Sequence, residues 1–233
     1  MSMQSMTPMI HISGLKFTYP GSAQPVLDIP EFQVQAGEKV FLFGPSGSGK
    51  TTFLEILAGI LQPQSGVTQV AGQDLGALTA AEKDKFRANN MGIIFQQFNL
   101  IPYLNIKENI ELPFLFNGKP KDESLQDKLL SRLGLTAFKN KPVSELSTGQ
   151  QQRVAVVRAL VIQPQLIIAD EPTSALDYDH REKFLALLFE LCAEQKATLI
   201  FVSHDRSIQK MFSRSQSLLD LNRAPAISNE SSV

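Results

Sequence analysis

One glycine-rich octapeptide constrains the fold of this chain more than any other stretch. It reads Gly-Pro-Ser-Gly-Ser-Gly-Lys-Thr from Gly44 to Thr51 and fits the pattern G-x-x-x-x-G-K-[ST]. The apolar run 39–43 before it predicts a strand, and the run 52–58 after it predicts a helix that stops at Gly59. Because the pattern binds phosphate in this strand–loop–helix setting, the sequence predicts a nucleotide-binding α/β fold.

The chemistry of the loop follows from its residue types. Glycines permit backbone angles that other residues resist, so successive N–H groups can converge on an anion at the start of a helix. Lys50 can reach the β- and γ-phosphates of a nucleotide, and the Thr51 hydroxyl can ligate Mg²⁺. The loop alone does not say what the nucleotide is used for.

The bulk composition excludes several classes of function. The 22 basic and 23 acidic residues leave a net charge of -1, without the basic excess of most nucleic-acid-binding domains, so we expect no nucleic-acid partner. The single cysteine, Cys192, provides neither a disulfide framework nor a zinc cluster. No apolar run approaches the roughly 20 residues that span a bilayer, and residues 1–6 do not resemble a secretory signal. We therefore expect a cytosolic chain that a partner holds at any membrane.

Strand and helix patterns alternate along the 233 residues. Residues 10–19 predict an edge-type strand and 26–34 its antiparallel partner, whereas the continuous apolar runs 166–169 and 198–202 predict strands buried on both faces of a parallel sheet. Residues 100–162 predict mainly helices. The expected architecture is an α/β fold with a mostly parallel core sheet, an antiparallel N-terminal β-subdomain and an inserted helical subdomain.

Polar residues follow the two buried strands: Asp170 and Glu171 after the first, and His204 after the second. In parallel sheets the site lies beyond the carboxyl ends of the strands, so these residues should meet the phosphate loop. A bound Mg²⁺ would give Asp170 the charged partner that a buried acid needs, and Glu171 could orient and deprotonate a water for in-line attack. His204 could hydrogen-bond the γ-phosphate or the water, although taken alone it is more often a satisfied residue at a strand end.

Three further features allow two interpretations from the residues alone. Tyr19 could stack on a purine or serve only in packing. The apolar loop 98–104 could be an internal bend or a docking surface. Ser147, Thr148, Gly149 and Gln150 could form a simple helix cap or a second anion site, which in a two-fold dimer would close over the nucleotide of the other copy.

Together these motifs resemble the ATP-binding cassette family, the ATPase subunits of ABC transporters, over about residues 10–220. The resemblance identifies 44–51 as the Walker A loop, 166–170 as Walker B, Glu171 as the catalytic glutamate, Gln96 as the Q-loop glutamine, 146–150 as the signature, 174–177 as the D-loop, His204 as the switch histidine and Tyr19 as the adenine-stacking aromatic. The fold it implies is that of a P-loop NTPase, with about 10–99 and 163–220 as the core and β-subdomain, about 100–162 as the helical subdomain and 221–233 as a flexible tail.

The resemblance also implies the cofactors ATP and Mg²⁺ and a set of site residues. The catalytic residues are Glu171, His204 and Gln96; the metal ligands are Thr51, Gln96 and Asp170; the ATP-binding residues are Tyr19, Gly44, Pro45, Ser46, Gly47, Ser48, Gly49, Lys50, Thr51, Thr52, Ser147, Gly149 and Gln150; the D-loop residues at the dimer interface are Ser174, Ala175, Leu176 and Asp177.

The mechanism that the resemblance implies is a homodimer that sandwiches two ATP molecules, each between one Walker A loop and the opposite signature. Hydrolysis and product release reopen the dimer. The loop around Gln96 and the exposed apolar segment from Phe98 to Leu104 are expected to contact the coupling helix of a membrane permease. The resemblance thus places the chain on the cytoplasmic face of the inner membrane and favours docking for this loop and base stacking for Tyr19.

The segments 95–102 and 108–113 and the glutamines after the signature look like macrolide-export and lipoprotein-release cassettes, whose permease has four membrane spans and a large periplasmic domain. One residue departs from the family: Thr148 stands where the signature usually has glycine, and we expect it to slow closure without abolishing hydrolysis. The alternative is a cassette of a DNA-repair, chromosome or translation system. Such proteins usually insert coiled coils, zinc modules or a second cassette, for which this sequence has no pattern.

Overall fold

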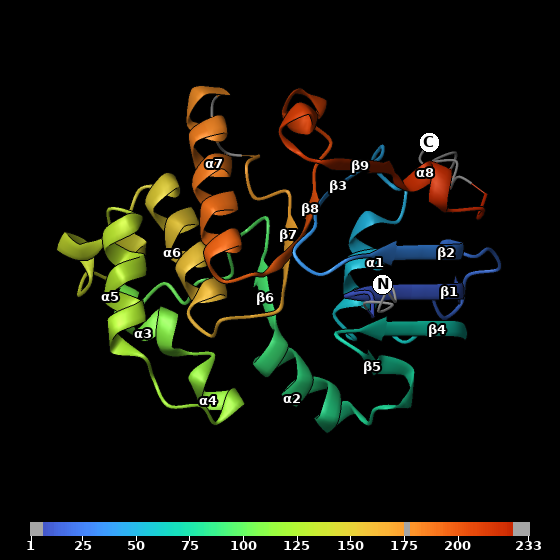
Figure 1. Ribbon diagram of the computed structural model, residues 1–233, viewed down its shortest axis with the longest axis horizontal. Helices are drawn as coiled ribbons and strands as arrows, with labels where there is room; N and C mark the ends of the chain where they lie inside the picture. Colours follow the sequence, from blue (N-terminus) through green and yellow to red (C-terminus); the bar gives the residue numbers. More distant parts are fainter. Residues whose placement is uncertain (1–6, 175–177, 226–233) are drawn as a thin grey trace, which may run out of the picture.

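An antiparallel sheet and a parallel sheet pack on either side of one helix in the computed structural model, which describes residues 7–174 and 178–225 (Figure 1). The antiparallel sheet has the order β2-β1-β4-β5, formed by β1 (Ile10–Phe17), β2 (Leu27–Val34), β4 (Ser65–Val70) and β5 (Gln73–Asp74). The parallel sheet has the order β6-β7-β8-β3-β9, formed by β3 (Lys39–Phe43), β6 (Met91–Ile94), β7 (Leu166–Asp170), β8 (Thr198–Val202) and β9 (Arg214–Ser217). This arrangement confirms the predicted α/β fold class.

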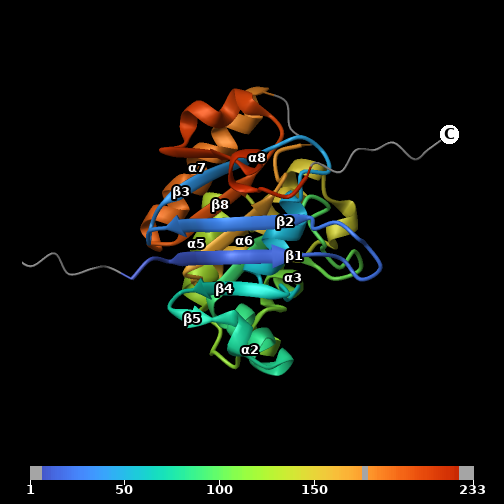
Figure 2. The same ribbon diagram turned by 90° about the vertical axis from the view of Figure 1, so that its right-hand side faces the viewer.

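Helix α1 (Lys50–Leu57) lies between the two sheets, and the parallel sheet is buried on both faces (Figures 1 and 2). Alternate residues of β3 serve different cores: Val40 and Leu42 pack with α1 and the antiparallel sheet, whereas Phe41 packs with the helices on the opposite face. Such two-sided burial explains why the parallel strands read as continuous apolar runs in the sequence.

Helices cover the face of the parallel sheet that is turned away from α1 (Figure 1). They are α3 (Ile106–Glu111), α4 (Phe114–Asn117), α5 (Glu123–Arg132), α6 (Thr148–Leu160) and α7 (Tyr178–Glu194), while α2 (Ala80–Asn90) precedes β6 and α8 (Leu218–Leu221) follows β9. The packing of α6 on β6 requires a glycine, because a Cβ atom at Gly92 would lie 2.3 Å from the backbone oxygen of Ala159. This contact joins the helical block to the sheet that carries the strand-end residues.

The helix starts follow local sequence signals. Thr79 with Glu82, Asn105 with Glu108, and Ser147 with Gln150 form the three predicted capping boxes. The predicted helix that begins near Asn105 does not run unbroken to Phe116, however. It divides into α3 and α4 at Pro113, which has no backbone N–H to continue the helical hydrogen bonds.

The prediction of β1 as an edge-type strand is wrong. Ile10 pairs with Val34 of β2 on one side and with Val70 of β4 on the other. The chain returns to β1 only after α1, and this long-range pairing leaves no local signal at residues 10–17.

The expectation that Phe98 is exposed is also wrong. Its side chain is only 7% exposed and belongs to the core beneath the helices, whereas Tyr103 is 79% exposed. The backbone turns in the left-handed conformation at Phe98 (φ 57°) and Asn99 (φ 48°), which a sequence pattern does not reveal. In the described part of the chain, no helix combines the length and apolarity that crossing a bilayer demands.

Candidate active site

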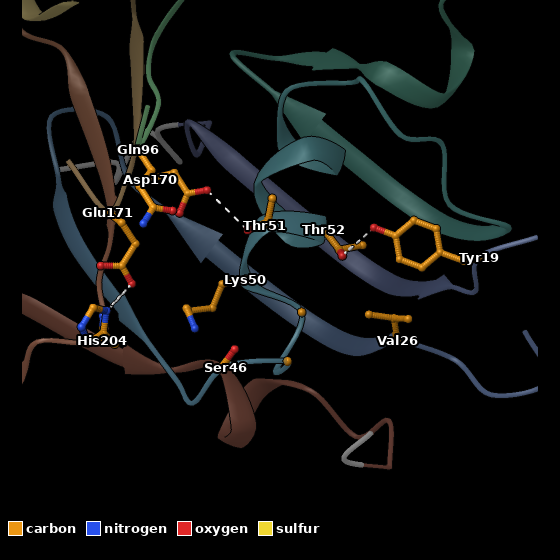
Figure 3. Close-up of a pocket in the computed structure, with 12 residues that line it drawn as sticks. Tyr19, Val26, Ser46, Lys50, Thr51, Thr52, Gln96, Asp170, Glu171 and His204 are labelled. Atoms are coloured by element: carbon orange, nitrogen blue, oxygen red, sulfur yellow. Dashed lines mark hydrogen bonds and ion pairs between the residues drawn. The ribbon is translucent and has the colours of Figure 1, made fainter. Parts of the chain in front are cut away.

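A pocket of about 470 Å³ lies where the phosphate loop meets the carboxyl ends of β6, β7 and β8 (Figure 3). Segments from far apart in the chain supply its lining: Tyr19, Val26, Ser46, Gly47, Gly49, Lys50, Thr51, Thr52, Gln96, Asp170, Glu171 and His204. The predicted convergence of three strand ends, the phosphate loop 44–51, Asp170 with Glu171, and His204, is therefore present in the structure, and Gln96 lines the same pocket.

The phosphate loop bends tightly from β3 into α1. Gly49 is the N-cap of α1 with φ 90°, and a Cβ atom there would lie 2.9 Å from Leu27 Cδ2, so glycine suits both the conformation and the space. Among the described residues no side chain caps α1, which leaves its first N–H groups directed toward the pocket. The Lys50 ammonium folds over the loop and donates to the backbone oxygens of Gly44 (2.9 Å) and Pro45 (2.8 Å).

Three predicted ATP-binding residues, Gly44, Pro45 and Ser48, do not line the pocket. A Cβ atom at Gly44 would lie 2.6 Å from Ser48 Oγ, which is buried and has no hydrogen-bond partner within the described ranges. Only the Ser48 side chain is buried behind the loop, and any contact of these three residues with a phosphate would come from backbone groups.

An acidic edge of the pocket joins α1 to β7. The Thr51 hydroxyl donates to Asp170 Oδ2 at 3.4 Å, and Gln96 lines the same pocket (Figure 3). Burial raises the pKa of Asp170 above its usual value and the charge of Glu171 raises it further, while Thr51 and Lys50 oppose both effects. A carboxylate whose charge is disfavoured in this way is suited to a cation.

The donor set of this edge fits Mg²⁺. Hydroxyl, carboxylate and amide oxygens are its preferred ligands, and Mg²⁺ usually takes one or two carboxylates together with substrate phosphates. Residues 7–174 and 178–225 hold no group of three His, Cys, Asp or Glu side chains that could bind a metal by themselves. The geometry therefore suits a metal that arrives with a nucleotide better than one held by protein alone.

The carboxylate of Glu171 is held by the end of β8. Ser203 Oγ donates to its Oε2 at 3.1 Å, and the backbone N–H of His204 donates to its Oε1 at 2.9 Å. The Nδ1 atom of His204 lies 2.8 Å from the same Oε1, while 70% of the His204 side chain is exposed. Glu171 itself adopts φ 46°, so both its backbone and its carboxylate are set by tertiary contacts.

The opposite end of the pocket is aromatic and apolar (Figure 3). The Tyr19 hydroxyl lies 2.9 Å from Thr52 Oγ1, and the rings of Tyr19 and Phe17 form a T-shaped pair at a centroid distance of 4.9 Å. The ring remains 40% exposed beside Val26, which also lines the pocket. A cavity with charged groups at one end and an exposed ring at the other matches the polarity of a nucleotide.

The remaining predicted residues lie outside this pocket. Ser147 and Gln150 satisfy each other as a capping box, through Gln150 N–H to Ser147 Oγ (3.3 Å) and Ser147 N–H to Gln150 Oε1 (3.0 Å). Gly149 has open space where a Cβ atom would stand. Ser174 is exposed and its N–H donates to the Glu171 backbone oxygen, whereas Ala175, Leu176 and Asp177 lie outside the described residues.

Sequence reasoning missed Val26 and Ser203. Val26 comes just before an ordinary strand and has no chemical signature, so only the fold places it in the pocket. Ser203 stands beside His204 after an apolar strand, and its hydrogen bond to Glu171 could have been anticipated from that position. The carboxylate of Glu171 accepts hydrogen bonds from Ser203 Oγ and the His204 N–H, lies against His204 Nδ1 and faces the pocket, so it combines a fixed orientation with the capacity to accept a proton.

Comparison with known proteins gives the same family throughout. The family model described as ABC transporter matches residues 27–174. The chain is 39% identical to the lipoprotein-releasing system ATP-binding protein LolD 1 of Rhodopirellula baltica, over 91% of this chain and 94% of the relative. It is 40% identical to the macrolide export ATP-binding/permease protein MacB of Photorhabdus laumondii over 87% of this chain, but it spans only 32% of that longer relative.

Solved structures agree with the sequence relatives. The dimeric post-hydrolysis state of the ATP-binding cassette MJ0796, bound to ADP and Pi, superposes with a TM-score of 0.82 at 35% identity and covers 94% of this chain and 98% of its own. The structure of cbiO1 from Clostridium perfringens, part of the ABC transporter complex cbiONQ, has a TM-score of 0.81 at 27% identity over 90% of this chain and 84% of its own.

Proposed function

This chain belongs to the ABC transporter family, in which it is an ATP-binding and ATP-hydrolysing subunit, and we propose that it drives a separate membrane permease of the macrolide-export or lipoprotein-release type. The observation that carries the proposal is the single pocket in which the phosphate loop, Asp170, Glu171 and His204 meet. A protein that only bound phosphate, or a small-molecule kinase, would need the phosphate loop but not Asp170, Glu171 and His204 together beside it.

We assign the residue roles as follows. Lys50 turns from the backbone oxygens of its own loop to the β- and γ-phosphates, while the N-terminus of α1 holds the phosphates and the Tyr19 ring stacks on the base. Thr51, Asp170 and Gln96 hold Mg²⁺, which when bound would neutralise charge on the phosphate oxygens. Glu171 orients the attacking water and accepts its proton, and His204 positions the Glu171 carboxylate and contacts the γ-phosphate.

The active site is completed by a second copy of the chain in this proposal. Ser147, Gly149 and Gln150 do not line the pocket of their own chain, and a capped helix start with an open glycine is a suitable surface for the γ-phosphate of the partner's ATP. The dimeric MJ0796 structures support this arrangement. Ser174, Ala175, Leu176 and Asp177 would then lie at the dimer interface.

The permease surface lies on the helical side of the molecule in this proposal. A groove of about 480 Å³ opens beside the loop that follows Gln96, lined by residues that include Phe95, Asn99 and Phe116. Tyr103 (79%), Leu115 (72%) and Phe116 (74%) are strongly exposed apolar or aromatic side chains. We place the coupling helix of the permease at Gln96–Leu104 and this groove, with Tyr103 in place of Phe98 as the exposed anchor.

The domain limits and the location are part of the same proposal. We divide the chain into a core and β-subdomain at about 10–99 and 163–220 and a helical subdomain at about 100–162. The flexible tail expected at 221–233 does not begin at Leu221, because Leu221 ends α8 and the Asn222 side chain bonds to the backbone of Asp28 and Val26. The MacB relatives carry a permease in the same chain, and this chain spans about a third of their length, so the permease is proposed as a partner. Such a partner would hold this chain at the cytoplasmic face of the inner membrane.

The test is the ATPase rate of the purified chain with three additions: the membrane protein encoded by the adjacent reading frame in lipid nanodiscs, double-stranded DNA, and ribosomes. Of the three additions, we expect only the membrane protein to co-purify with the chain and to stimulate its ATP turnover. Stimulation by DNA or ribosomes, with no effect of the membrane protein, would exclude the transport assignment in favour of the non-transport cassettes.

A further inference from the structure

A half-buried guanidinium on α6, that of Arg158, is bonded to the loop that follows Gln96. Arg158 Nη1 donates to the backbone oxygen of Asn99 and Nη2 to that of Phe98, both at 2.6 Å. Burial lowers the pKa of Arg158, and within the described ranges no carboxylate lies in salt-bridge range of it. Two charge-assisted hydrogen bonds to neutral carbonyls therefore take the place of an ion pair.

The two carbonyls that Arg158 binds belong to the most unusual backbone of this region. Phe98 (φ 57°) and Asn99 (φ 48°) are consecutive non-glycine residues in the left-handed region, which is costly for a large side chain such as phenylalanine. The Phe98 amide donates to the Phe95 oxygen at 3.0 Å and the Asn99 amide donates to the Gln97 oxygen at 2.6 Å, so the loop is closed in a tight turn. Such a conformation persists only where its surroundings hold it.

The turn lies between two functional surfaces. Gln96, at one end of it, lines the nucleotide pocket, and Asn99, at the other, lines the groove beside α4 together with Arg158. Helix α6 also begins with the Ser147–Gln150 capping box, so Arg158 connects the element that starts at the signature to the loop that carries Gln96.

We infer that Arg158 is a positioning residue: its two-pronged contact holds the strained turn at Phe98 and Asn99 and thereby sets Gln96 in the nucleotide pocket and the floor of the adjoining groove. Loss of the contact lets the turn relax, and Gln96 then no longer reaches its place beside Asp170. The inference rests on the proposed role of Gln96 in turnover. Whether Arg158 holds the turn can be measured separately, by a method that does not depend on activity.

The variants are Arg158→Met, which keeps the unbranched stem without donors, and Arg158→Lys, which can serve one carbonyl but not both in the planar fork. Arg153→Lys is the matched control, because Arg153 lies on the same helix and donates to one backbone oxygen, that of Leu133, at 3.1 Å. If Arg158→Met does not fold, Arg158→Lys carries the test.

The first measurement is hydrogen exchange of the full-length protein at residues 97–100. We expect at least about tenfold faster exchange of these amides in Arg158→Met and an intermediate change in Arg158→Lys, because the amides of Phe98 and Asn99 are bonded only while the turn is closed. Exchange equal to wild type in both variants overturns the inference, whatever the activity shows. Arg153→Lys should leave this peptide unchanged.

The second measurement is a double-mutant cycle on ATP turnover. Arg158→Lys should lower kcat while leaving the Kd for ATP without metal within about twofold, and it should have no further effect in a Gln96→Ala background, because both changes remove the same group from the site. Equal fold losses in the two backgrounds would show a merely structural role and overturn the inference. If Gln96→Ala itself leaves kcat unchanged, the assigned role of Gln96 fails, and the exchange result alone decides whether Arg158 holds the turn.

Discussion

Glu171 and His204 are bonded twice: the backbone N–H and the ring Nδ1 of His204 lie 2.9 and 2.8 Å from one carboxylate oxygen of Glu171. Ser203 donates to the other oxygen, so the end of β8 fixes the carboxylate that follows β7. A general base is effective only when its orientation is fixed, and two adjacent parallel strands fix it here without any contribution from the phosphate loop.

Glu171→Gln should bind ATP with unchanged affinity and lose hydrolysis by about 10²- to 10⁴-fold, because the amide keeps the shape of the side chain but cannot accept the proton. The trapped ATP should hold the protein as a dimer. Equilibrium ATP binding measures the affinity, phosphate release measures the hydrolysis rate, and light scattering after size exclusion measures the oligomeric state. A purely monomeric variant at saturating ATP would contradict the sandwich dimer.

Lys50→Ala should reduce ATP turnover by roughly 10²-fold or more, since it removes the flexible cation closest to the phosphate loop. The fold should survive, because Lys50 bonds only to carbonyls of its own loop in the structure. Lys85→Ala, an exposed lysine of α2, is the control. Turnover of Lys50→Ala equal to that of Lys85→Ala would remove the phosphate-loop assignment.

Asp170→Asn should raise the melting temperature of the nucleotide-free protein by a few degrees at pH 7 and abolish stabilisation by Mg²⁺ with ATP. Burial and Glu171 raise the folded-state pKa of Asp170 above its unfolded value, so the folded state binds a proton more readily than the unfolded state. The penalty for the charged form is absent below the unfolded pKa of about 3.9 and grows as pH rises through the folded pKa. The rise in melting temperature of Asp170→Asn should therefore disappear toward pH 4. The exposed control Asp220→Asn should show no such pH-dependent rise.

Phe98→Ser should destabilise the protein by about 3–5 kcal/mol, the range for removing a buried phenylalanine ring, and should impair permease binding only through loss of fold. Tyr103→Ser should change the free energy of unfolding by no more than about 0.5 kcal/mol and should weaken capture by the permease. Urea unfolding and a pull-down separate the two effects. Full retention of Tyr103→Ser on the permease would disprove Tyr103 as an anchor.

The sequence by itself determined the elements whose signals are local. Capping boxes at Thr79, Asn105 and Ser147 begin helices, and apolar runs give the buried strands β7 and β8. The phosphate loop follows from glycine spacing because Gly47 (φ 78°) and Gly49 (φ 90°) adopt backbone angles that favour glycine. The convergence of Asp170, Glu171 and His204 on the phosphate loop was also predictable, since strand ends of a parallel sheet share one edge.

Only the tertiary structure decided which groups meet and which are buried. The strand β1 is an inner strand because β4 returns to it from a distant part of the chain, and Phe98 is buried because its left-handed turn places the ring in the core beneath the helices. Val26 lines the pocket for the same reason, through neighbours far away in sequence. Periodicity reports the pattern along one element, whereas burial and orientation depend on the free energy of contacts between elements, and the fold alone brings those contacts together.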